Sequence, residues 1–363
     1  MMDQHIGHIH TGSNWGGGEN QVLNLLHGLT RKGIKTTLYA NPKGELLHRA
    51  LKKNLPAVPL PINSYDNFFA GFSRRIRNQF QKNKIDLLHV HDSLATTIGS
   101  SVARHLQIPV VLSRRIASPL RRNILSRNKY SEKKLDAVIA ISHTVKDVFC
   151  QNGYPQENVY VVASGVDIDA LDKIEKNESF TQQFGGNYLV GGIGKLSVKK
   201  NWQFMIRVAA HLKECGQDIQ WVVIGDGPEK NRLKRLAKSS GVNDRIHFLG
   251  FQPDAVKLLK NFDVLFFPSL MEGASVTVRD AMVMAVPVVA VDAPGTMESL
   301  DGHGWRIQTD DVPNAANSVL EALLDPILRD KRCIGARASA IQRFSINRTV
   351  EDTISVYRAV LTK

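Results

Sequence analysis

Short apolar stretches alternate with longer amphipathic stretches along the whole chain. A first series of apolar stretches contains HIGHIH, KTTLYA, DLLHVHD, IPVVLS, DAVIAIS and VYVVAS, and a second contains YLVGGIG, IQWVVIGDG, RIHFLG, VLFFPS and PVVAV. The stretches between them, such as ENQVLNLLHGLTRKG and WQFMIRVAAHLKECG, have helical periodicity. Strands that alternate with helices in this way are typical of parallel sheets with crossover helices. Because a polar stretch at 172–183 separates the two series, the pattern predicts two doubly wound α/β domains.

The size of the chain is also consistent with two domains. With 363 residues, 43% of them hydrophobic, the chain is longer than a domain with a single hydrophobic core usually is. The sequence predicts an N-terminal Rossmann-like domain over residues 1–170, a linker over 171–183 and a C-terminal Rossmann-like domain over 184–345. Ligands of open parallel sheets bind beyond the carboxyl ends of the strands. We therefore expect the domains to face a cleft, with functional residues directly after the strands.

The positive charge of the chain is concentrated in two segments. The net charge is +13; residues 71–84 hold five bases and no acid, and residues 113–134 hold eight bases and one acid. Such segments attract nucleic acid, anionic lipid or phosphorylated substrates, or they form a solvated helix face. Aromatic residues do not interleave with the bases as stacking platforms, which disfavours nucleic acid. Apolar residues at roughly helical intervals favour either docking on an anionic membrane or packing against the sheet: Phe72, Ile76, Phe80, Ile116, Leu120, Ile124 and Leu125.

The chain lacks the sequence features of a membrane-spanning or secreted protein. No uncharged apolar run reaches the ~20 residues of a membrane span. The N-terminal stretch MMDQHIGHIH lacks the charged-then-apolar layout of a signal peptide. The three cysteines, Cys150, Cys215 and Cys333, are far apart and match no metal or redox spacing. We expect a cytoplasmic protein with free thiols.

Two strand ends carry groups suited to an anion. After the first strand, TGSNWGGGEN leads into a helix, and such a glycine-rich turn lets backbone N–H groups approach a phosphate or sugar; a flexible surface loop is the alternative. The turn does not meet G-x-G-x-x-G, which disfavours a nicotinamide-dependent oxidoreductase. GGIGKLSVKKN fails the P-loop pattern but places Lys195 and Lys200 just past a strand, where two cations can neutralise a diphosphate without a metal.

The stretch FPSLMEGASVTVRDAM holds two carboxylates, Glu272 and Asp280. Its pattern puts Glu272 in a strand-to-helix loop and Asp280 about two turns into the helix, so they lie roughly 12 Å apart at most. That exceeds the ~5–9.5 Å between paired carboxylates of glycoside hydrolysis. The spacing fits the two ends of a nucleotide sugar, with Glu272 near sugar hydroxyls and Asp280 near ribose hydroxyls. Four residues between the two carboxylates are expected to point their backbone N–H groups at the diphosphate of this ligand: Gly273, Ala274, Ser275 and Val276.

These residues carry a resemblance to a known family. PSLMEGASVTVRDAMVMAVPVVAVDAPGTMESL resembles the donor-binding signature of retaining glycosyltransferase family 4 (glycosyl transferases group 1), which has the GT-B fold. GKLSVKKN resembles the pair of diphosphate-binding cations of that family, and WGGGEN resembles its N-terminal glycine loop. VIGDGPEKNRL, IHFLGF and SGVD also match, in the family order. The resemblance therefore covers nearly the whole chain.

The resemblance implies a retaining transferase that moves a hexose-type sugar from a nucleotide-diphosphate sugar, with UDP or GDP, to a saccharide or lipid-linked acceptor. It implies no cofactor and no metal in the active site. It also implies a role in cell-envelope polysaccharide or lipopolysaccharide synthesis, peripheral at the cytoplasmic face of the inner membrane. Residues 346–363 are expected to form a helix that crosses back to the N-terminal domain.

The resemblance also assigns residues. The catalytic assignments are Lys195, Lys200 and Glu272, and Glu298 matches a further acid near the donor. The donor-binding assignments are Gly17, Gly18, Gly194, Gly250, Phe251, Gly273, Ala274, Ser275, Val276 and Asp280. The acceptor candidates are His91, Arg114 and Arg115.

Three positions depart from the family pattern. Asp280 stands where the second acid is usually glutamate, and Lys195 stands where arginine is frequent, which keeps the charge but loses the bidentate fork. Arg115 stands where many members have a histidine. An arginine there can hold a phosphate or carboxylate of the acceptor.

Histidines in the first and fourth apolar stretches raise the question of a metal site. His89 and His91 in HVHD alternate along a strand and are expected to point in opposite directions, which disfavours one zinc ion holding both. His91 or Asp92, at the strand end, is a candidate to line the acceptor site. His8 and His10 have the same spacing and are interpreted as strand residues.

Two further functions stay open beside the glycosyltransferase. A nucleotide-sugar 2-epimerase shares the GT-B fold but has no need of a basic acceptor site. A basic nucleic-acid-binding or membrane-binding protein, not an enzyme, would account for the charge alone.

Overall fold

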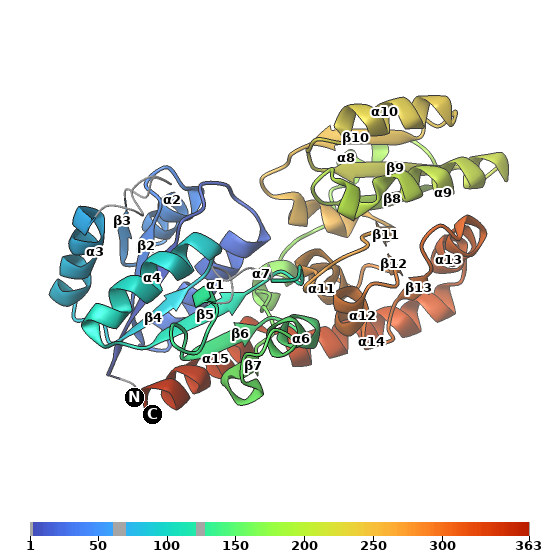
Figure 1. Cartoon of the computed structure of the whole chain (residues 1–363). Helices are drawn as coiled ribbons and strands as arrows, with labels where there is room; N and C mark the ends of the chain where they lie inside the picture. The colour runs from blue at the N-terminus through green and yellow to red at the C-terminus, as the bar shows by residue number, and fades with distance from the viewer. Residues whose placement is uncertain (1–2, 61–69, 121–127, 363) are drawn as a thin grey trace. The chain divides into compact units, whose positions relative to one another are not determined.

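The computed structural model describes residues 3–60, 70–120 and 128–362. The chain forms two compact units. Unit 1 comprises Met1–Gly165 and Ile346–Lys363, and unit 2 comprises Val166–Ser345 (Figure 1). Residues 171–183, expected to be a linker, contain a short helix and belong to unit 2.

Unit 1 is built on a parallel sheet of seven strands in the order β3-β2-β1-β4-β5-β6-β7. The order reverses between β1 and β4, which is where open α/β sheets bind ligands at their carboxyl edge. The strands are β1 (His5–His10), β2 (Lys35–Ala40), β3 (Ala57–Pro59), β4 (Leu87–Val90), β5 (Val110–Arg114), β6 (Ala137–Ala140) and β7 (Val159–Val161). The helices are α1 (Gly17–Arg31), α2 (Glu45–Lys52), α3 (Ala70–Lys82), α4 (Ser93–Leu106), α6 (His143–Cys150), the 3-10 helix η2 (Gln156–Asn158) and α15 (Ile346–Leu361).

Unit 2 has a parallel sheet of six strands in the order β10-β9-β8-β11-β12-β13, which reverses between β8 and β11. The strands are β8 (Tyr188–Ile193), β9 (Ile219–Ile224), β10 (Ile246–Gly250), β11 (Val264–Phe267), β12 (Val288–Val291) and β13 (Trp305–Ile307). The helices are α7 (Ile168–Asp172), α8 (Glu178–Gln182), α9 (Trp202–Glu214), α10 (Lys230–Ser239), α11 (Val276–Val283), α12 (Pro294–Leu300), α13 (Val312–Leu324) and α14 (Pro326–Phe344), with 3-10 turns η3 (Val198–Lys200) and η4 (Ala255–Asn261). Both predicted Rossmann-like sheets are therefore confirmed.

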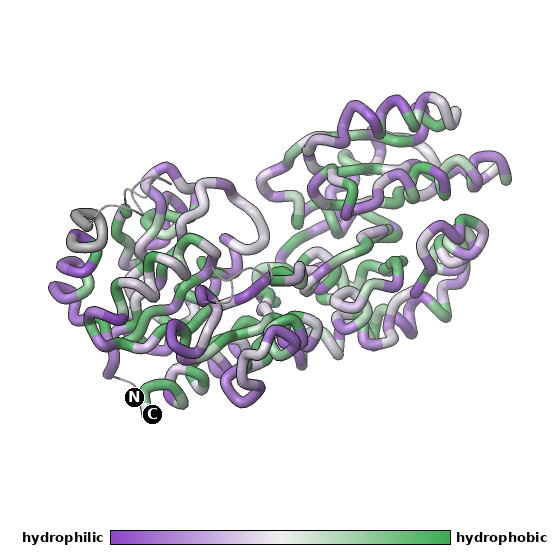
Figure 2. Tube along the Cα trace, in the orientation of Figure 1, coloured by the Kyte–Doolittle hydropathy of each residue, from purple (hydrophilic) through white to green (hydrophobic). Residues whose placement is uncertain are grey.

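The inner strands, such as β1, β4, β9 and β11, are buried on both faces, as expected for parallel sheets covered by helices. In unit 2, Trp221 and Phe266 meet edge to face with ring centroids 5.8 Å apart, in a core that also takes in α9 and α13. Figure 2 shows the contrast between the largely hydrophobic strands and α10, whose outer face is hydrophilic. Only Leu233 and Ala237 of α10 are buried, because a surface helix needs one apolar stripe.

Helix α15 completes the core of unit 1, although it comes from the end of the chain. Val350, Ile354 and Tyr357 pack with Leu25 and Leu29 of α1 in one cluster of buried residues. The two helices approach closely because position 28 of α1 is glycine. A Cβ on Gly28 would lie 2.4 Å from Cγ2 of Val350.

The apolar residues of segment 71–84 were candidates for a membrane face, and the structure favours the alternative of packing against the sheet. Ile76 and Phe80 on α3 are 1% and 0% exposed. The Phe80 ring meets Tyr39 of β2 with centroids 4.7 Å apart. In segment 113–134, Ile116 is 55% exposed and Leu120 is partly buried. The side chains of Phe72, Ile124 and Leu125 lie outside the described residues.

Of the helices that the structure describes, none has the length and apolar character needed to cross a membrane.

The contact between α1 and α15 gives a stability prediction. Gly→Ala in a helix interior usually stabilises by about 0.5–1 kcal/mol, but overpacking costs about 1–3 kcal/mol. Because the added methyl would overlap Val350, we expect Gly28→Ala to lower the free energy of unfolding by about 1–2 kcal/mol, measured by urea denaturation. In a Val350→Ala background the same substitution should be neutral or stabilising. An increase in stability in both backgrounds would contradict the tight contact.

Candidate active site

The loops at the carboxyl edge of the unit 2 sheet are joined through their backbones. The N–H of Gly194, after β8, donates to the carbonyl of Ile224 at 2.9 Å, and the N–H of Gly225, after β9, donates to Gly250 at the end of β10 at 2.8 Å. A Cβ on Gly225 would lie 2.0 Å from the carbonyl oxygen of Gly194. This approach requires glycine, and it fixes Gly194 and Gly250 next to the same strand ends.

Lys200 lies at the end of the turn η3 and points at a carboxylate. Its Nζ is 2.5 Å from Oε1 of Glu272 and 4.9 Å from the centroid of the Phe267 ring. The pair is only partly exposed, with 24% and 14% of the two side chains accessible. The side chain of Lys195 is exposed instead, while its carbonyl accepts a 3.0 Å hydrogen bond from the indole of Trp202.

Glu272 is held by more than Lys200. The hydroxyl of Ser269 donates to the same Oε1 atom at 2.6 Å. The start of α12 supports the loop from behind, where a Cβ on Gly295 would lie 2.3 Å from the carbonyl oxygen of Glu272. Sequence analysis missed Ser269 and Phe267, although both lie in the stretch that ends β11 and leads to Glu272.

Helix α11 follows this loop and presents its N-terminus. Ser275 is the N-cap, and its side chain accepts a hydrogen bond from the N–H of Val278 at 3.3 Å. Gly273 and Ala274 thus lie in the loop before the N-cap, and Val276 is the first residue of the helix, whose first-turn N–H groups lack partners among the carbonyls of the helix. Gly250, with φ of 73°, ends β10 at this edge of the sheet, and the exposed residue Phe251 follows it.

Asp280 lies one turn into α11, not two as predicted, because the helix begins only at Val276. The rise from the first residue is about 6 Å. Burial raises the pKa of its carboxyl to about 7, although the neighbouring Arg279 guanidinium lowers it. The Asp280 carboxyl is therefore only partly ionised near neutral pH. Its strength as a hydrogen-bond acceptor for a ligand should change with pH in this range.

Arg279 points away from this edge into the interior of unit 2. Its side chain is 1% exposed, and its guanidinium lies 4.0 Å from the centroid of the Phe344 ring. Burial lowers its pKa to about 10, and the carboxylate of Glu298 on α12 opposes this shift. Glu298 thus interacts with the buried side of α11.

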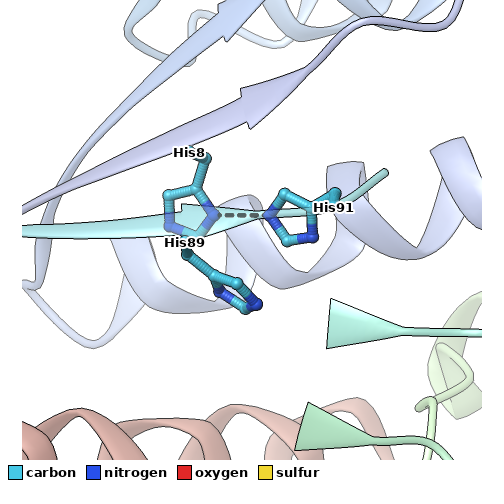
Figure 3. A group of neighbouring side chains, drawn as sticks. All are labelled: His8, His89 and His91. Carbon is cyan, nitrogen blue, oxygen red and sulfur yellow. Dashed lines mark hydrogen bonds between the residues drawn. The ribbon is translucent and has the colours of Figure 1, made fainter. Parts of the chain in front are cut away.

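In unit 1 three histidines come together, which the sequence analysis predicted wrongly. The rings of His89 and His91 have centroids 4.1 Å apart, and His8 of β1 lies beside them (Figure 3). The reason is the period of a strand, since residues i and i+2 lie on the same face. His8 Nδ1 and His91 Nε2 are 3.0 Å apart and share a hydrogen bond.

One nitrogen of each of these histidines lies within 4.8 Å of the others, so a metal has to be considered. Both nitrogens of His89 already have partners, Tyr357 Oη at 2.6 Å and Ser113 Oγ at 2.7 Å. His91 Nδ1 faces the guanidinium of Arg115 at 3.1 Å. A cation at that distance opposes a metal ion, and the available lone pairs are already used. The residues fit a hydrogen-bonded network better than a metal centre.

The direction of this network follows from Arg115, because a guanidinium can only donate. His91 Nδ1 must accept, so its proton is on Nε2 and is donated to His8 Nδ1. All three histidines are neutral, since burial holds the pKa of His89 and His91 well below the usual value and that of His8 near 3. His8 Nε2 has no hydrogen-bond partner in the described part of the chain.

The remaining predicted residues of unit 1 lie around this network. Gly17 and Gly18 begin α1 after the N-cap Gly16. Arg114 folds back onto its own loop, where it donates to the carbonyls of Ile116 at 3.1 Å and Ser118 at 2.9 Å. Asp92 is a structural residue: its carboxylate caps α4 and accepts two bonds from Thr11. The predicted sites therefore form one group at the carboxyl edge of unit 2 and another in unit 1.

Both halves of the chain match known sequence families. The sequence model described as "Glycosyltransferase Family 4" matches residues 15–170, and the one described as "Glycosyl transferases group 1" matches residues 173–338. The putative glycosyltransferase EpsF of Bacillus subtilis is 22% identical over 79% of this chain and 78% of its own. The UDP-Gal:alpha-D-GlcNAc-diphosphoundecaprenol alpha-1,3-galactosyltransferase of Escherichia coli is 23% identical over 76% of each chain.

Solved structures agree on the fold. HepE of Anabaena, in complex with UDP and glucose, superposes with a TM-score of 0.83 at 20% identity, covering 98% of this chain and all of its own. The lipopolysaccharide outer core galactosyltransferase WaaB superposes with a TM-score of 0.74 at 14% identity, covering 98% of this chain and 99% of its own. With two parallel Rossmann-like sheets and both halves matched, the chain belongs to the GT-B glycosyltransferases of group 1 and is a hexosyltransferase.

Proposed function

We propose that the protein is a retaining glycosyltransferase that moves a hexose from a nucleotide-diphosphate sugar to a saccharide or lipid-linked acceptor in cell-envelope glycan synthesis. The observation that carries this proposal is the arrangement of Lys200, Glu272 and the N-terminus of α11, with Asp280 one turn further along. UDP is the preferred nucleotide, because HepE was solved with UDP and the Escherichia coli relative is named for UDP-galactose.

The donor is proposed to lie along the carboxyl edge of the unit 2 sheet. Asp280 receives the ribose hydroxyls, and the first-turn N–H groups of α11 receive the diphosphate, helped by the helix dipole. Phe251 offers an exposed aromatic face to the base. Glu272 accepts hydrogen bonds from the sugar.

The ion pair between Lys200 and Glu272 suggests how the donor is received. Glu272 neutralises the ammonium group of Lys200. A diphosphate supplies a second set of anionic oxygens, so it competes with Glu272 for the same cation. Lys195, whose side chain is exposed, brings a second positive charge that needs no rearrangement.

Catalysis in this proposal is electrostatic. The acceptor hydroxyl attacks the anomeric carbon on the face from which the diphosphate leaves, and the leaving phosphate takes the proton. Lys195, Lys200 and the N–H groups stabilise the charge that builds on that phosphate. No protein nucleophile and no metal is needed for this step.

We further propose that the enzyme works at the cytoplasmic face of the inner membrane. The support is the chemistry of its relatives, since the Escherichia coli protein is named for a diphosphoundecaprenol acceptor and WaaB for the lipopolysaccharide outer core. Ile116 is an exposed apolar residue in the second basic segment, consistent with contact at a lipid surface.

Nucleotide binding tests the donor site. In calorimetric titrations with UDP, GDP and ADP, we expect one nucleotide, UDP, to bind with micromolar affinity. Asp280→Ala and Lys200→Ala should each weaken it about tenfold, which corresponds to ~1.4 kcal/mol. Lys199→Ala, one residue away and exposed, removes the same charge and is the control. If no nucleotide binds and the variants behave alike, the proposed location of the donor site is wrong.

Glu272 should behave differently from Lys200. Because Glu272 forms an ion pair with Lys200 and so competes with a diphosphate for this cation, Glu272→Ala should leave the affinity for bare UDP unchanged or raise it. The same substitution should weaken UDP-glucose relative to UDP, since a hydrogen-bond acceptor for the sugar is lost. Comparison of the two titrations on one variant separates the roles. A large loss of UDP affinity would show that Glu272 holds the nucleotide itself.

The raised pKa of Asp280 predicts a pH dependence. Hydroxyls donate more strongly to a carboxylate than to a carboxylic acid. With a pKa of about 7, about one carboxyl in ten is ionised at about pH 6, so UDP affinity should rise about tenfold from there to about pH 8 and then level off. The terminal phosphate of UDP also titrates near pH 6. Asp280→Asn reports that contribution alone, and an equal slope in both proteins would exclude Asp280.

A further inference from the structure

Helix α14 of unit 2 presents a row of isoleucines to solvent. Ile327, Ile334 and Ile341 are 83%, 70% and 39% exposed, and each follows the one before it after seven residues. Seven residues make almost two turns of a helix, so the three side chains lie along one line on its surface. In the described part of the chain, Ile327 and Ile334 are the most exposed of the large hydrophobic side chains. Single exposed apolar residues are ordinary, but an aligned row indicates a contact surface.

The isoleucines belong to a longer pattern. Two further exposed residues of α14 lie between them on the same line, at intervals that alternate between four and three residues. This is the spacing of the seam along which two helices of a coiled coil meet. The opposite face of α14 is buried in unit 2, through Cys333 and Ala340 among others. We call the exposed set the α14 seam: Ile327, Lys331, Ile334, Ala338 and Ile341.

The arginines of α14 are directed into unit 2 and not along the seam. Arg337 donates to both carboxylate oxygens of Asp172, at 2.9 and 3.0 Å. Arg343 donates to a backbone carbonyl of α12 at 2.6 Å. The guanidinium of Arg332 lies 4.7 Å from the centroid of the Trp305 ring. These cations therefore hold α14 on unit 2.

The charge that remains on the exposed face distinguishes between two kinds of partner. Its exposed charged residues, Asp330 and Lys331, have opposite signs. Helices that dock on anionic lipid carry several lysines and arginines beside their apolar face, each contributing about 1 kcal/mol. A nearly neutral face with a regular apolar seam is instead suited to another protein helix.

We propose that the α14 seam is the interface of a symmetric dimer, in which the seams of two copies of this chain pack against each other in antiparallel orientation. This inference concerns the assembly of the protein and does not depend on the proposed function.

A second copy is the partner because the seam is complementary to itself. With the two-fold axis at Ile334, this residue faces its own counterpart, Ile327 faces Ile341, and the long side chain of Lys331 lies beside the small Ala338. A contact of this kind closes after two subunits. A parallel pair would instead bring the two Lys331 ammonium groups together, at a cost in stability. The antiparallel pair separates them by about 9 Å along the helix axis.

The size of the seam fits a reversible dimer. From Ile327 to Ile341 the seam extends for about 21 Å. Covering its exposed side chains and their neighbours in both copies removes on the order of 1,000 Å² from water, which is at the low end of specific interfaces. We therefore expect a dissociation constant in the micromolar range.

The seam borders the amino edge of the unit 2 sheet. Ile334 lines a groove of about 560 Å³, which also takes in the residues where three strands begin: Tyr188 of β8, Asp263 before β11 and Pro287 before β12. The proposed donor site lies at the opposite, carboxyl edge of the same sheet. Dimerisation through the seam therefore leaves the donor edge of unit 2 uncovered.

The test measures the mass of the full-length chain, 40.3 kDa for one copy, by analytical ultracentrifugation at increasing protein concentration. We expect the wild type to pass from monomer to dimer between about 1 and about 200 µM. Ile334→Glu should stay monomeric, because two carboxylates would then face each other in the interface. Leu51→Glu, at an exposed apolar residue on α2, adds the same charge and should dimerise as the wild type does. Because Ile334 and Leu51 are exposed, the thermal unfolding of both variants should match that of the wild type.

A second variant tests the orientation. Ala338→Glu places a carboxylate on the same face, four residues from Ile334, but beside Lys331 of the second copy. In an antiparallel pair this variant should dimerise at least as tightly as the wild type at low salt and lose the gain at high salt. Dissociation of Ala338→Glu together with Ile334→Glu would overturn the antiparallel pairing.

The remaining outcomes bear on the dimer itself. A wild-type chain that stays monomeric up to about 200 µM, or a dimer that Ile334→Glu leaves intact, would overturn the proposal. Flotation with phosphatidylglycerol vesicles gives the lipid alternative its own readout. If the wild type binds these vesicles, Ile334→Glu does not, and both are monomers in solution, the seam contacts lipid and the dimer is wrong.

Discussion

The carboxyl edge of unit 2 depends on backbone contacts that leave no room for side chains. Gly225 meets the carbonyl of Gly194, and Gly295 meets the carbonyl of Glu272, at distances that a Cβ would not permit. Loops packed in this way have few conformations available. The groups they carry, Lys200 and Glu272 among them, are therefore held in place before a ligand arrives, and enzymes that work by electrostatic stabilisation need such fixed charges.

Unit 1 accommodates a partly buried positive charge with neutral hydrogen-bond partners and not with an ion pair. Its core contains three neutral histidines beside an arginine, and the proton positions on His91 and His8 follow from the fact that the arginine can only donate. Tyr357 and Ser113 complete the chain of hydrogen bonds. The polar network thus replaces the ion pair that a partly buried guanidinium would otherwise require, and the positive charge stays available at the carboxyl edge of the sheet.

Much of this could be predicted from the sequence, and the omissions have physical causes. The alternation of apolar and amphipathic stretches predicted both sheets, because strands and helices each have a local periodicity that can be seen in the sequence. The placement of Glu272 in a loop and of Asp280 in the helix that follows also came from local spacing, apart from the exact start of α11. The partners of Arg115 could not be predicted, since Gln21, His91 and Tyr357 come from three distant segments. His89 and His91 were misplaced by an error about strand period. For Ile76 and Phe80, membrane docking and packing against the sheet both stayed open, because an apolar stripe does not show what covers it.

The position of α15 has a consequence for how the protein is made. A ribosome delivers the first sheet, then all of unit 2, and only after unit 2 the helix that closes the core of unit 1. Until then Leu25 and Leu29 lack their cover, and His89 lacks the hydroxyl of Tyr357. The first half of the chain must therefore wait, incompletely packed, while the second half folds. A chain that stops before α15 would contain every residue of unit 2 and still leave unit 1 unfinished.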